Sequence, residues 1–293
     1  MKRALLSLAF IMHMAAYPSS AQTEQRYPVR GLVLGVDRAH QMMTVSCEEI
    51  RGYMDAMVMP FKVKDSKSLT GLGEGIQIEF TLIVTKENSY ADQIRIVRYA
   101  SSEREPSKSR RLQTLQNALD GSRSPLVEPG RTVPDFALTD QNKKSVRLSD
   151  FTGKVVALNF VYTRCALPDY CYRLSNNFGV LQKRFKDRLG RDLILLTVTF
   201  DPVHDQPEVL GEYARTWKAD GINWRFLTGS APAVQRVCDL FGVSYVPDEG
   251  LFVHSLHTAV IDRERRLITN LEGNEFTAQQ LGDLVDAALD RAK

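Results

Sequence analysis

The sequence predicts two domains of different class, an all-β domain followed by an α/β domain. Its 293 residues exceed the length of one typical domain. Short alternating runs with glycine between them occupy residues 30–98, whereas long apolar runs separated by helix-length segments occupy residues 131–293. The segment 99–130 begins with a polar, charged stretch that is typical of a solvated linker. These three observations set the division of the chain.

The first domain is predicted to be a small OB-like β-barrel. Five short runs alternate apolar and polar residues or are rich in β-formers, and Gly71, Gly73 and Gly75 punctuate them. Closure of such a set into an antiparallel barrel removes exposed strand edges. The runs are 32–36, 43–45, 61–63, 76–84 and 94–97.

The second domain is predicted to have a partly parallel sheet. Residues 155–161 and 193–200 are near-continuous apolar runs, as expected of strands buried on both faces. A helix-length segment lies between them, and Asp205 followed by Glu208 has the pattern of a helix start with Asp205 as N-cap. Two later β-like runs and a terminal helix complete the order βαβα then ββα of a thioredoxin-like domain. They are 258–261, 267–271 and 277–292.

Residues 1–21 have the layout of a secretory signal peptide. Lys2 and Arg3 precede an apolar stretch, and small residues end the segment. We therefore expect an exported, periplasmic protein, with a membrane anchor formed by an uncleaved leader as the alternative. A formal net charge of only +3 argues against a nucleic-acid partner.

Two cysteines mark the end of the first long apolar run. Cys165 and Cys171 are separated by five residues and lead into a helix. Ligands gather at such strand ends, and a helix N-terminus favours thiolate over thiol. Pro168 suits a first helical position, which would place Cys171 in the first turns. A redox-active or metal-binding pair is predicted, and a structural disulfide is the alternative.

A histidine is the expected third member of this site. His254 and His257 would face opposite sides of an extended run, so at most one shares a face with the cysteines. A single imidazole at a strand end is commonly a satisfied polar residue. Two thiolates and one imidazole, however, form a set suited to Cu(I) or Cu(II).

A second group of sulfur-bearing side chains lies in the first domain. Cys47, Met54, Met57 and Met59 fall within thirteen residues of one another. Met57 and Met59 would share one face of a strand, so their soft sulfurs could converge on one ion. The alternative is that methionine fills the core of a small barrel. Cys238 has helical spacing with apolar neighbours and is expected in the core.

The region from about residue 133 resembles the Sco/SenC family, thioredoxin-fold copper proteins that serve cytochrome c oxidase assembly. The resemblance rests on Asn159 to Cys165 (NFVYTRC), Pro168 to Cys171 (PDYC), Thr199 to Pro207 (TFDPVHDQP) and the His254-Ser255 step. It implies copper ligation by Cys165, Cys171 and His254. The five residues between the cysteines depart from the family's usual three, which bears on coordination geometry.

The stretch from Ser46 to Phe61 resembles the periplasmic CusF-like copper-binding domain. There, a histidine and two methionines bind Cu(I) beside an aromatic ring. Met57 and Met59 match the methionines, Cys47 stands near the histidine position, and Met54 falls near the aromatic one. The resemblance implies a second copper site on Cys47, Met54, Met57 and Met59.

Together these features predict an exported copper-binding protein, either a metallochaperone or a thiol-redox assembly factor, in copper delivery to cytochrome c oxidase. The expected partner is an oxidase subunit or another copper chaperone. The alternatives are a thiol:disulfide oxidoreductase or thioredoxin-like peroxidase, acting through Cys165 and Cys171, and a periplasmic copper-resistance buffer. Absence of a Cys-x-x-Cys motif disfavours the enzymes.

Overall fold

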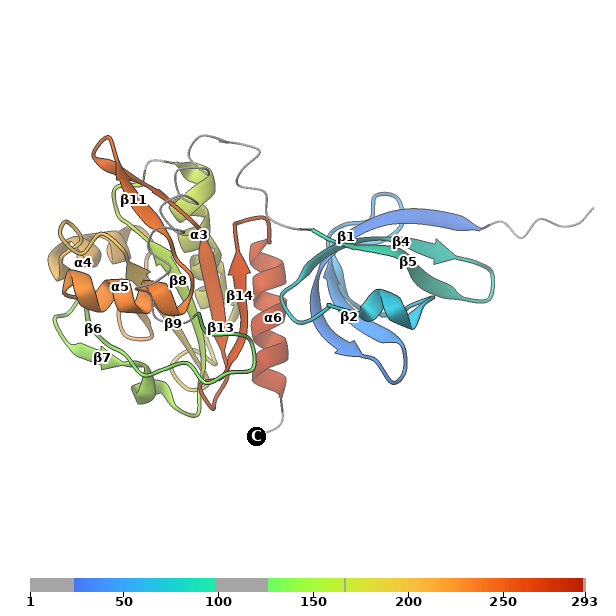
Figure 1. Ribbon diagram of the computed structural model, residues 1–293, viewed down its shortest axis with the longest axis horizontal. Coiled ribbons are helices and arrows are strands. Elements are labelled where there is room, and N and C mark those ends of the chain that lie inside the picture. The colour runs from blue at the N-terminus through green and yellow to red at the C-terminus, as the bar shows by residue number, and fades with distance from the viewer. Residues whose placement is uncertain (1–23, 98–125, 166, 292–293) are drawn as a thin grey trace, which may run out of the picture.

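The computed structural model describes residues 24–97, 126–165 and 167–291. These residues form two β-sheet domains, between which a single helix lies (Figure 1). The predicted leader, residues 1–21, lies outside the described residues, as does most of the predicted linker. The predicted fold class, all-β followed by thioredoxin-like α/β, is confirmed.

The N-terminal domain is a five-stranded antiparallel sheet with the spatial order β3-β2-β1-β4-β5. All five predicted strands are present, but no continuous ladder closes the sheet into a barrel. Beyond the end of β3, Val63 forms an isolated bridge to Ala91, which is the only such link between the two edges among the described residues. The elements are β1 (Gln25–Asp37), β2 (Met42–Cys47), β3 (Met57–Lys62), the short helix η1 (Ser66–Leu69), β4 (Gln77–Val84) and β5 (Ser89–Ile96).

The C-terminal domain is built on a seven-stranded mixed sheet with the order β14-β13-β8-β9-β10-β6-β7. Strands β8, β9 and β10 are parallel, and every residue of β8 and β9 is buried, as their apolar sequences predict. The strands are β6 (Ala137–Asp140), β7 (Ser145–Arg147), β8 (Val155–Val161), β9 (Leu193–Thr199), β10 (Trp224–Thr228), β13 (His257–Ile261) and β14 (Leu267–Glu272).

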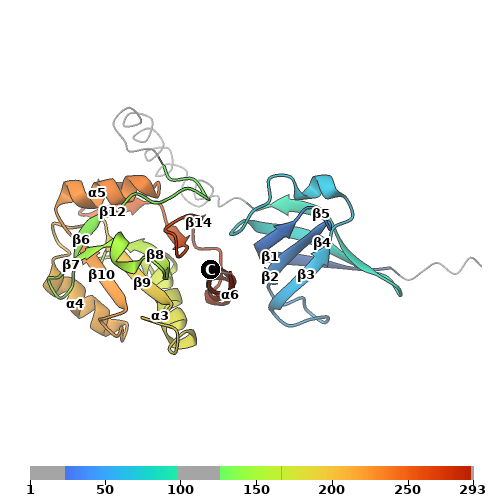
Figure 2. The ribbon, with the colours of Figure 1, turned by 90° about the horizontal axis from the view of Figure 1, so that it is seen from below.

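Helices cover both faces of this sheet. Figure 2 shows α5 on one side and α3 and α4 on the other, and α6 packs beside α3. A separate two-stranded hairpin, β11 (Tyr245–Asp248) and β12 (Leu251–His254), stands outside the main sheet. The helical elements are η2 (Leu148–Phe151), η3 (Pro168–Tyr172), α3 (Arg173–Arg184), α4 (Pro207–Thr216), α5 (Ala231–Leu240) and α6 (Ala278–Asp290).

One buried carboxylate joins the two domains. Asp283 of α6 accepts a hydrogen bond from Ser46 Oγ of β2 at 2.7 Å, and its other oxygen accepts one from Arg184 of α3 at 2.7 Å. Leu32 and Leu34, on the face of β1 that lies toward α6, are buried in the same apolar cluster as the core of the second domain. The opposite face of the sheet therefore forms the separate core of the N-terminal domain.

Candidate metal site

The loop after β8 carries both predicted cysteines. Cys165 is half-buried, and Cys171 lies inside η3 with 1% of its surface exposed. Pro168 occupies the start of η3, as expected from its fixed φ and missing N–H. Tyr170 interrupts the helical backbone (φ −110°, ψ −116°) before α3 begins. The irregular backbone at Tyr170 thus immediately precedes Cys171, whose sulfur lies within 4.8 Å of that of Cys165.

The hairpin brings His254 to these cysteines. The sulfurs of Cys165 and Cys171 and a ring nitrogen of His254 all lie within 4.8 Å of one another, and Cys171 Sγ is 3.7 Å from His254 Nε2. His254 Nδ1 lies 2.9 Å from the carbonyl oxygen of Ser255, which can only accept, so Nδ1 carries the proton. Nε2 therefore presents its lone pair to the two sulfurs, as metal-binding imidazoles do.

The two thiols are electrostatically unequal. A hydrogen bond from Cys171 lowers the pKa of Cys165 to about 4. Burial raises the pKa of Cys171 well above the ordinary value. At neutral pH the metal-free site therefore holds one thiolate, stabilised by a neighbouring thiol.

This inequality predicts how alkylation depends on pH. In the reduced, metal-free protein, the iodoacetamide rate at Cys165 should stay level through neutral pH and fall only near the pKa of about 4, because the thiolate is the nucleophile. Mass spectrometry of the modified peptide measures this rate. Replacing Cys171 by alanine, which has no donor, should shift the profile to higher pH. A rate at Cys165 that climbs about tenfold per pH unit through neutrality, as for a free thiol with a pKa of about 8.5, would contradict the prediction.

Aromatic rings enclose the histidine. The ring centroid of His254 lies 4.8 Å from that of Phe200 and 5.6 Å from that of Tyr162, with Tyr170 at 6.0 Å. Burial raises the pKa of Tyr162 to about 12, so its hydroxyl stays neutral. None of these three rings belongs to a residue predicted for the site from the sequence. Two of them could have been predicted from the sequence, because Tyr162 and Phe200 each directly follow a buried strand, at the edge of the sheet where the cysteines lie.

The acidic loop after β9 supports the cysteine loop. Asp205 is fully buried and accepts hydrogen bonds from the backbone N–H of Thr163 at 3.0 Å and from its hydroxyl at 2.5 Å. The hydroxyl of Thr199 is a further donor at 2.5 Å. The prediction that Asp205 caps the following helix is wrong: α4 begins at Pro207 with Gln206 as N-cap. The carboxylate instead holds a loop about forty residues away in sequence.

In the N-terminal domain, three of the four predicted sulfur ligands lie on one face of the sheet, and the fourth lies in a loop. Cys47 pairs with Met57 and Val45 with Met59 across β2 and β3, so Cys47, Met57 and Met59 share the core face of the sheet. Met57 is 45% exposed and Met59 half-buried, whereas Cys47 is buried and its pKa is raised to about 12 by burial. Met54 lies in the β2–β3 loop, bridged to Ile50. Metal binding to Cys47 would thus require loss of a tightly held proton.

An aromatic pair lies in the same domain. Tyr53 stacks on Tyr27 with ring centroids 4.3 Å apart. Tyr53 is next to Met54, the residue that sequence analysis assigns to the aromatic position, and it is 43% exposed.

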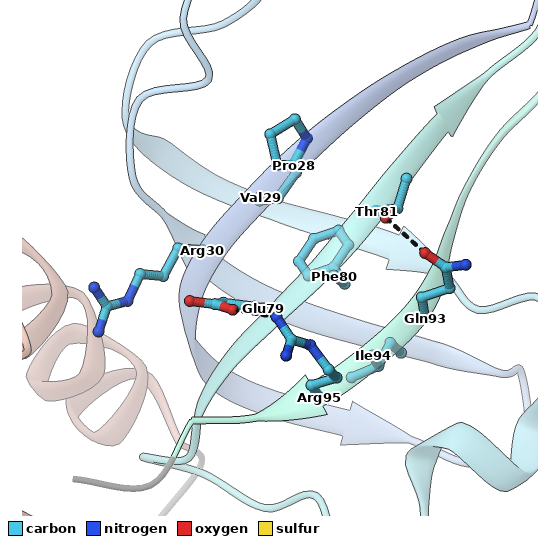
Figure 3. A pocket seen from close by; sticks show the side chains of 9 residues that line it. All are labelled: Pro28, Val29, Arg30, Glu79, Phe80, Thr81, Gln93, Ile94 and Arg95. Atoms are coloured by element: carbon cyan, nitrogen blue, oxygen red, sulfur yellow. Dashed lines mark hydrogen bonds and ion pairs between the residues drawn. The ribbon is translucent and has the colours of Figure 1, made fainter. Parts of the chain in front are cut away.

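A groove of about 670 Å³ also runs along β1, β4 and β5 (Figure 3). Its charged side chains are paired: Arg95 donates to Glu79 at 2.8 Å, and Arg30 extends toward α6 and donates at 3.4 Å to Glu275, in the loop before that helix. Thr81 and Gln93 are hydrogen-bonded to each other. None of the predicted metal ligands lines this groove.

Comparison with known proteins identifies both domains. The model of the SCO1/SenC family matches residues 125–289, more than half of the chain. The chain belongs to the SCO1/SenC family. Residues 26–95 match the model described as copper binding periplasmic protein CusF. Both resemblances stated from the sequence are confirmed, and copper is the metal that these comparisons support.

Individual Sco proteins match the second domain. The SCO1 protein homolog of Bacillus subtilis is 30% identical over 97 residues, which are 33% of this chain and 49% of that protein. A SCO2-like protein of Rickettsia prowazekii is 30% identical over 139 residues, 45% of this chain and 64% of that protein. This chain thus covers less than two thirds of either relative.

A solved structure supports the fold. The crystal structure of a SCO1/SenC family lipoprotein from Bacillus anthracis is 25% identical, with a TM-score of 0.50, and covers 56% of this chain and 99% of that one. Within the residues that the structure describes, no helix is both long and apolar enough to cross a membrane.

Proposed function

We propose that this chain is an exported copper-binding protein that delivers copper to cytochrome c oxidase or maintains the thiols of its copper site. The observation that carries this proposal is the convergence of Cys165, Cys171 and His254 from three separate elements within 4.8 Å. Membership in the SCO1/SenC family supports it. An oxidase subunit or another copper chaperone is the proposed partner.

The donor set fits copper. Two sulfurs and one imidazole nitrogen are soft and borderline ligands, which suit Cu(I) and, with the imidazole, Cu(II). The thiolate at Cys165 is already formed at neutral pH, so binding there needs the loss of one proton, from Cys171. As cargo, copper would pass to a partner by exchange of one soft ligand at a time. Cys165 is the half-exposed member of the set and is the proposed point of exchange.

The N-terminal domain is proposed to hold a second copper ion. Met57 and Met59 share one face of β3, and Met57 is open to solvent. Cys47 is their neighbour across the strand pair and Met54 lies in the adjoining loop. The CusF match over residues 26–95 supports a copper role for this group. The predicted leader and the periplasmic description of that family support an exported location.

Titration with Cu(I) under a competing chelator tests the proposal. The reduced chain is expected to bind two equivalents, and the variant Met57→Ala/Met59→Ala should bind one, because two of its soft donors are gone. Met42→Ala is the control, since it removes a half-buried methionine of the same domain outside the predicted site, and it should retain two equivalents. Binding of only one equivalent by the unaltered chain would remove the N-terminal site from the account.

A thiol:disulfide oxidoreductase is the second candidate, and the low pKa of Cys165 favours it. A half-exposed thiolate beside a buried thiol is also the arrangement of redox-active cysteine pairs. Turnover of a disulfide substrate by the copper-free protein, lost in Cys165→Ser, would support this function. A copper-resistance buffer would use the same ligands; normal oxidase activity in a deletion strain would favour it over delivery.

A further inference from the structure

The position of His254 depends on a hairpin that the main sheet does not hold. Strands β11 and β12 pair only with each other, so no strand ladder joins the hairpin to the main sheet and it is held by side chains, among them Tyr245 and Phe252, which pack on Phe200. At its base, Ser255 N–H donates to the carbonyl of Ser244 at 2.8 Å, and Ser244 N–H donates to Ser255 Oγ at 2.9 Å. His254 stands at this base end, opposite the hairpin tip at Glu249 and Gly250.

One side chain ties the tip to the metal loop. Arg164, the residue before Cys165, donates from Nη1 to the carbonyl of Gly250 at 2.8 Å. Its Nε and Nη2 both donate to Asp201 Oδ2, at 3.1 and 2.7 Å. Asp201 is 4% exposed, and its own N–H donates to Thr199 Oγ1 at 3.0 Å. The guanidinium thus joins the cysteine loop, the loop after β9 and the hairpin.

The tip presents this carbonyl in a fixed direction. Glu249 and Gly250 have φ of +48° and +82°, the two positive values of a tight two-residue hairpin turn. The planar guanidinium of Arg164 can donate hydrogen bonds to the Gly250 carbonyl and the Asp201 carboxylate at the same time. A lysine ammonium, a point charge on a flexible stem, would hold both acceptors less well.

We propose that Arg164 is a positioning residue for copper binding, which holds the hairpin closed so that His254 stays within reach of Cys165 and Cys171. The inference rests on the proposed function and deepens it. Arg164 donates to no atom of the ligands, so its effect passes through the hairpin. Without the tie, the tip separates from the cysteine loop and the imidazole is offered to copper for a smaller fraction of the time.

A double-mutant cycle in the full-length protein tests this route. Arg164→Met is expected to weaken Cu(I) binding at the C-terminal site about fivefold to tenfold, and Arg164→Lys by less. In a His254→Ala background, Arg164→Met should change the affinity by less than about twofold. Equal losses in both backgrounds would show that Arg164 acts independently of His254 and would overturn the proposal.

Hydrogen exchange of the metal-free protein gives a second readout that needs no copper. Arg164→Met should speed exchange of the hairpin amides, residues 245–254, about fivefold to tenfold, while β8 and β9 remain protected. Arg147→Met is the matched control, because Arg147 donates to Asp135 through the same two nitrogens, Nε and Nη2, at 3.1 and 2.8 Å at the far edge of the sheet. Unchanged hairpin exchange would overturn the tie even if copper binds as proposed. If Arg164→Met speeds hairpin exchange but the unaltered chain binds no copper, the proposed function would be refuted, while the role of Arg164 in holding the hairpin would stand.

Discussion

Replacing Cys171 by serine is expected to abolish copper binding at the C-terminal site. Serine keeps the shape of the side chain but offers a hard hydroxyl in place of a soft sulfur. If a protein metal site is worth about 10 kcal/mol and three donors share it, one donor accounts for roughly a few hundredfold in affinity.

Competition with a chromophoric Cu(I) chelator measures this loss in the Met57→Ala/Met59→Ala background, where one site remains. Cys238→Ala is the matched control. Cys238 is also fully buried, in α5 as sequence analysis expected, and its removal should leave the copper stoichiometry unchanged. Undiminished affinity in Cys171→Ser would exclude Cys171 as a ligand.

Replacing Asp205 by alanine is expected to cost about 3–5 kcal/mol of unfolding free energy, because three donors would lose a fully buried charged acceptor. The donors are the N–H and hydroxyl of Thr163 and the hydroxyl of Thr199. Since Thr163 lies two residues before Cys165, the cysteine loop should become mobile as well. Urea denaturation measures the stability, and the alkylation rate at Cys165 reports on the loop.

Asp205→Asn separates the two requirements of this position, shape and charge. The amide keeps one acceptor oxygen and introduces an N–H₂ group that faces donors, so an intermediate loss of about 1–3 kcal/mol is expected. A loss below about 0.5 kcal/mol in Asp205→Ala, the range of an ordinary surface substitution, would show that the carboxylate does not support the loop.

Much of the fold could be predicted because its strands carry local signals. The apolar runs that became β8 and β9 are buried at every residue, and the terminal helix appears as α6 with its predicted apolar face. The hairpin β11–β12 was not predicted, since its strands are four residues long and only partly buried. Barrel closure also failed as a prediction, because the contact between sheet edges is set by tertiary packing rather than by the pattern of any one strand.

The site could be predicted in composition but not in geometry. Spacing indicated two cysteines at a strand end, yet the kink at Tyr170 that folds them together has no local signature. Because side chains alternate between the two faces of an extended run, only one of His254 and His257 could reach the cysteines. The structure places His254 beside them. The two histidines lie in different strands, and burial lowers the pKa of His257 to about 4.

Long-range contacts account for the remaining differences. Asp205 has the local pattern of a helix cap, but two threonines from other elements compete successfully for its carboxylate. Cys47 and Met57 meet because β2 pairs with β3 in a register that brings their side chains to one face. Sequence alone does not reveal that this face is buried at Cys47 and open at Met57.

X-ray absorption at the copper edge tests the central claim most directly. The Met57→Ala/Met59→Ala protein, reduced and loaded with one equivalent of Cu(I), should show two sulfur neighbours and one nitrogen neighbour. The His254→Ala form of the same protein should lose the nitrogen. A shell without sulfur, or a nitrogen contribution that persists in His254→Ala, would contradict a site formed by Cys165, Cys171 and His254.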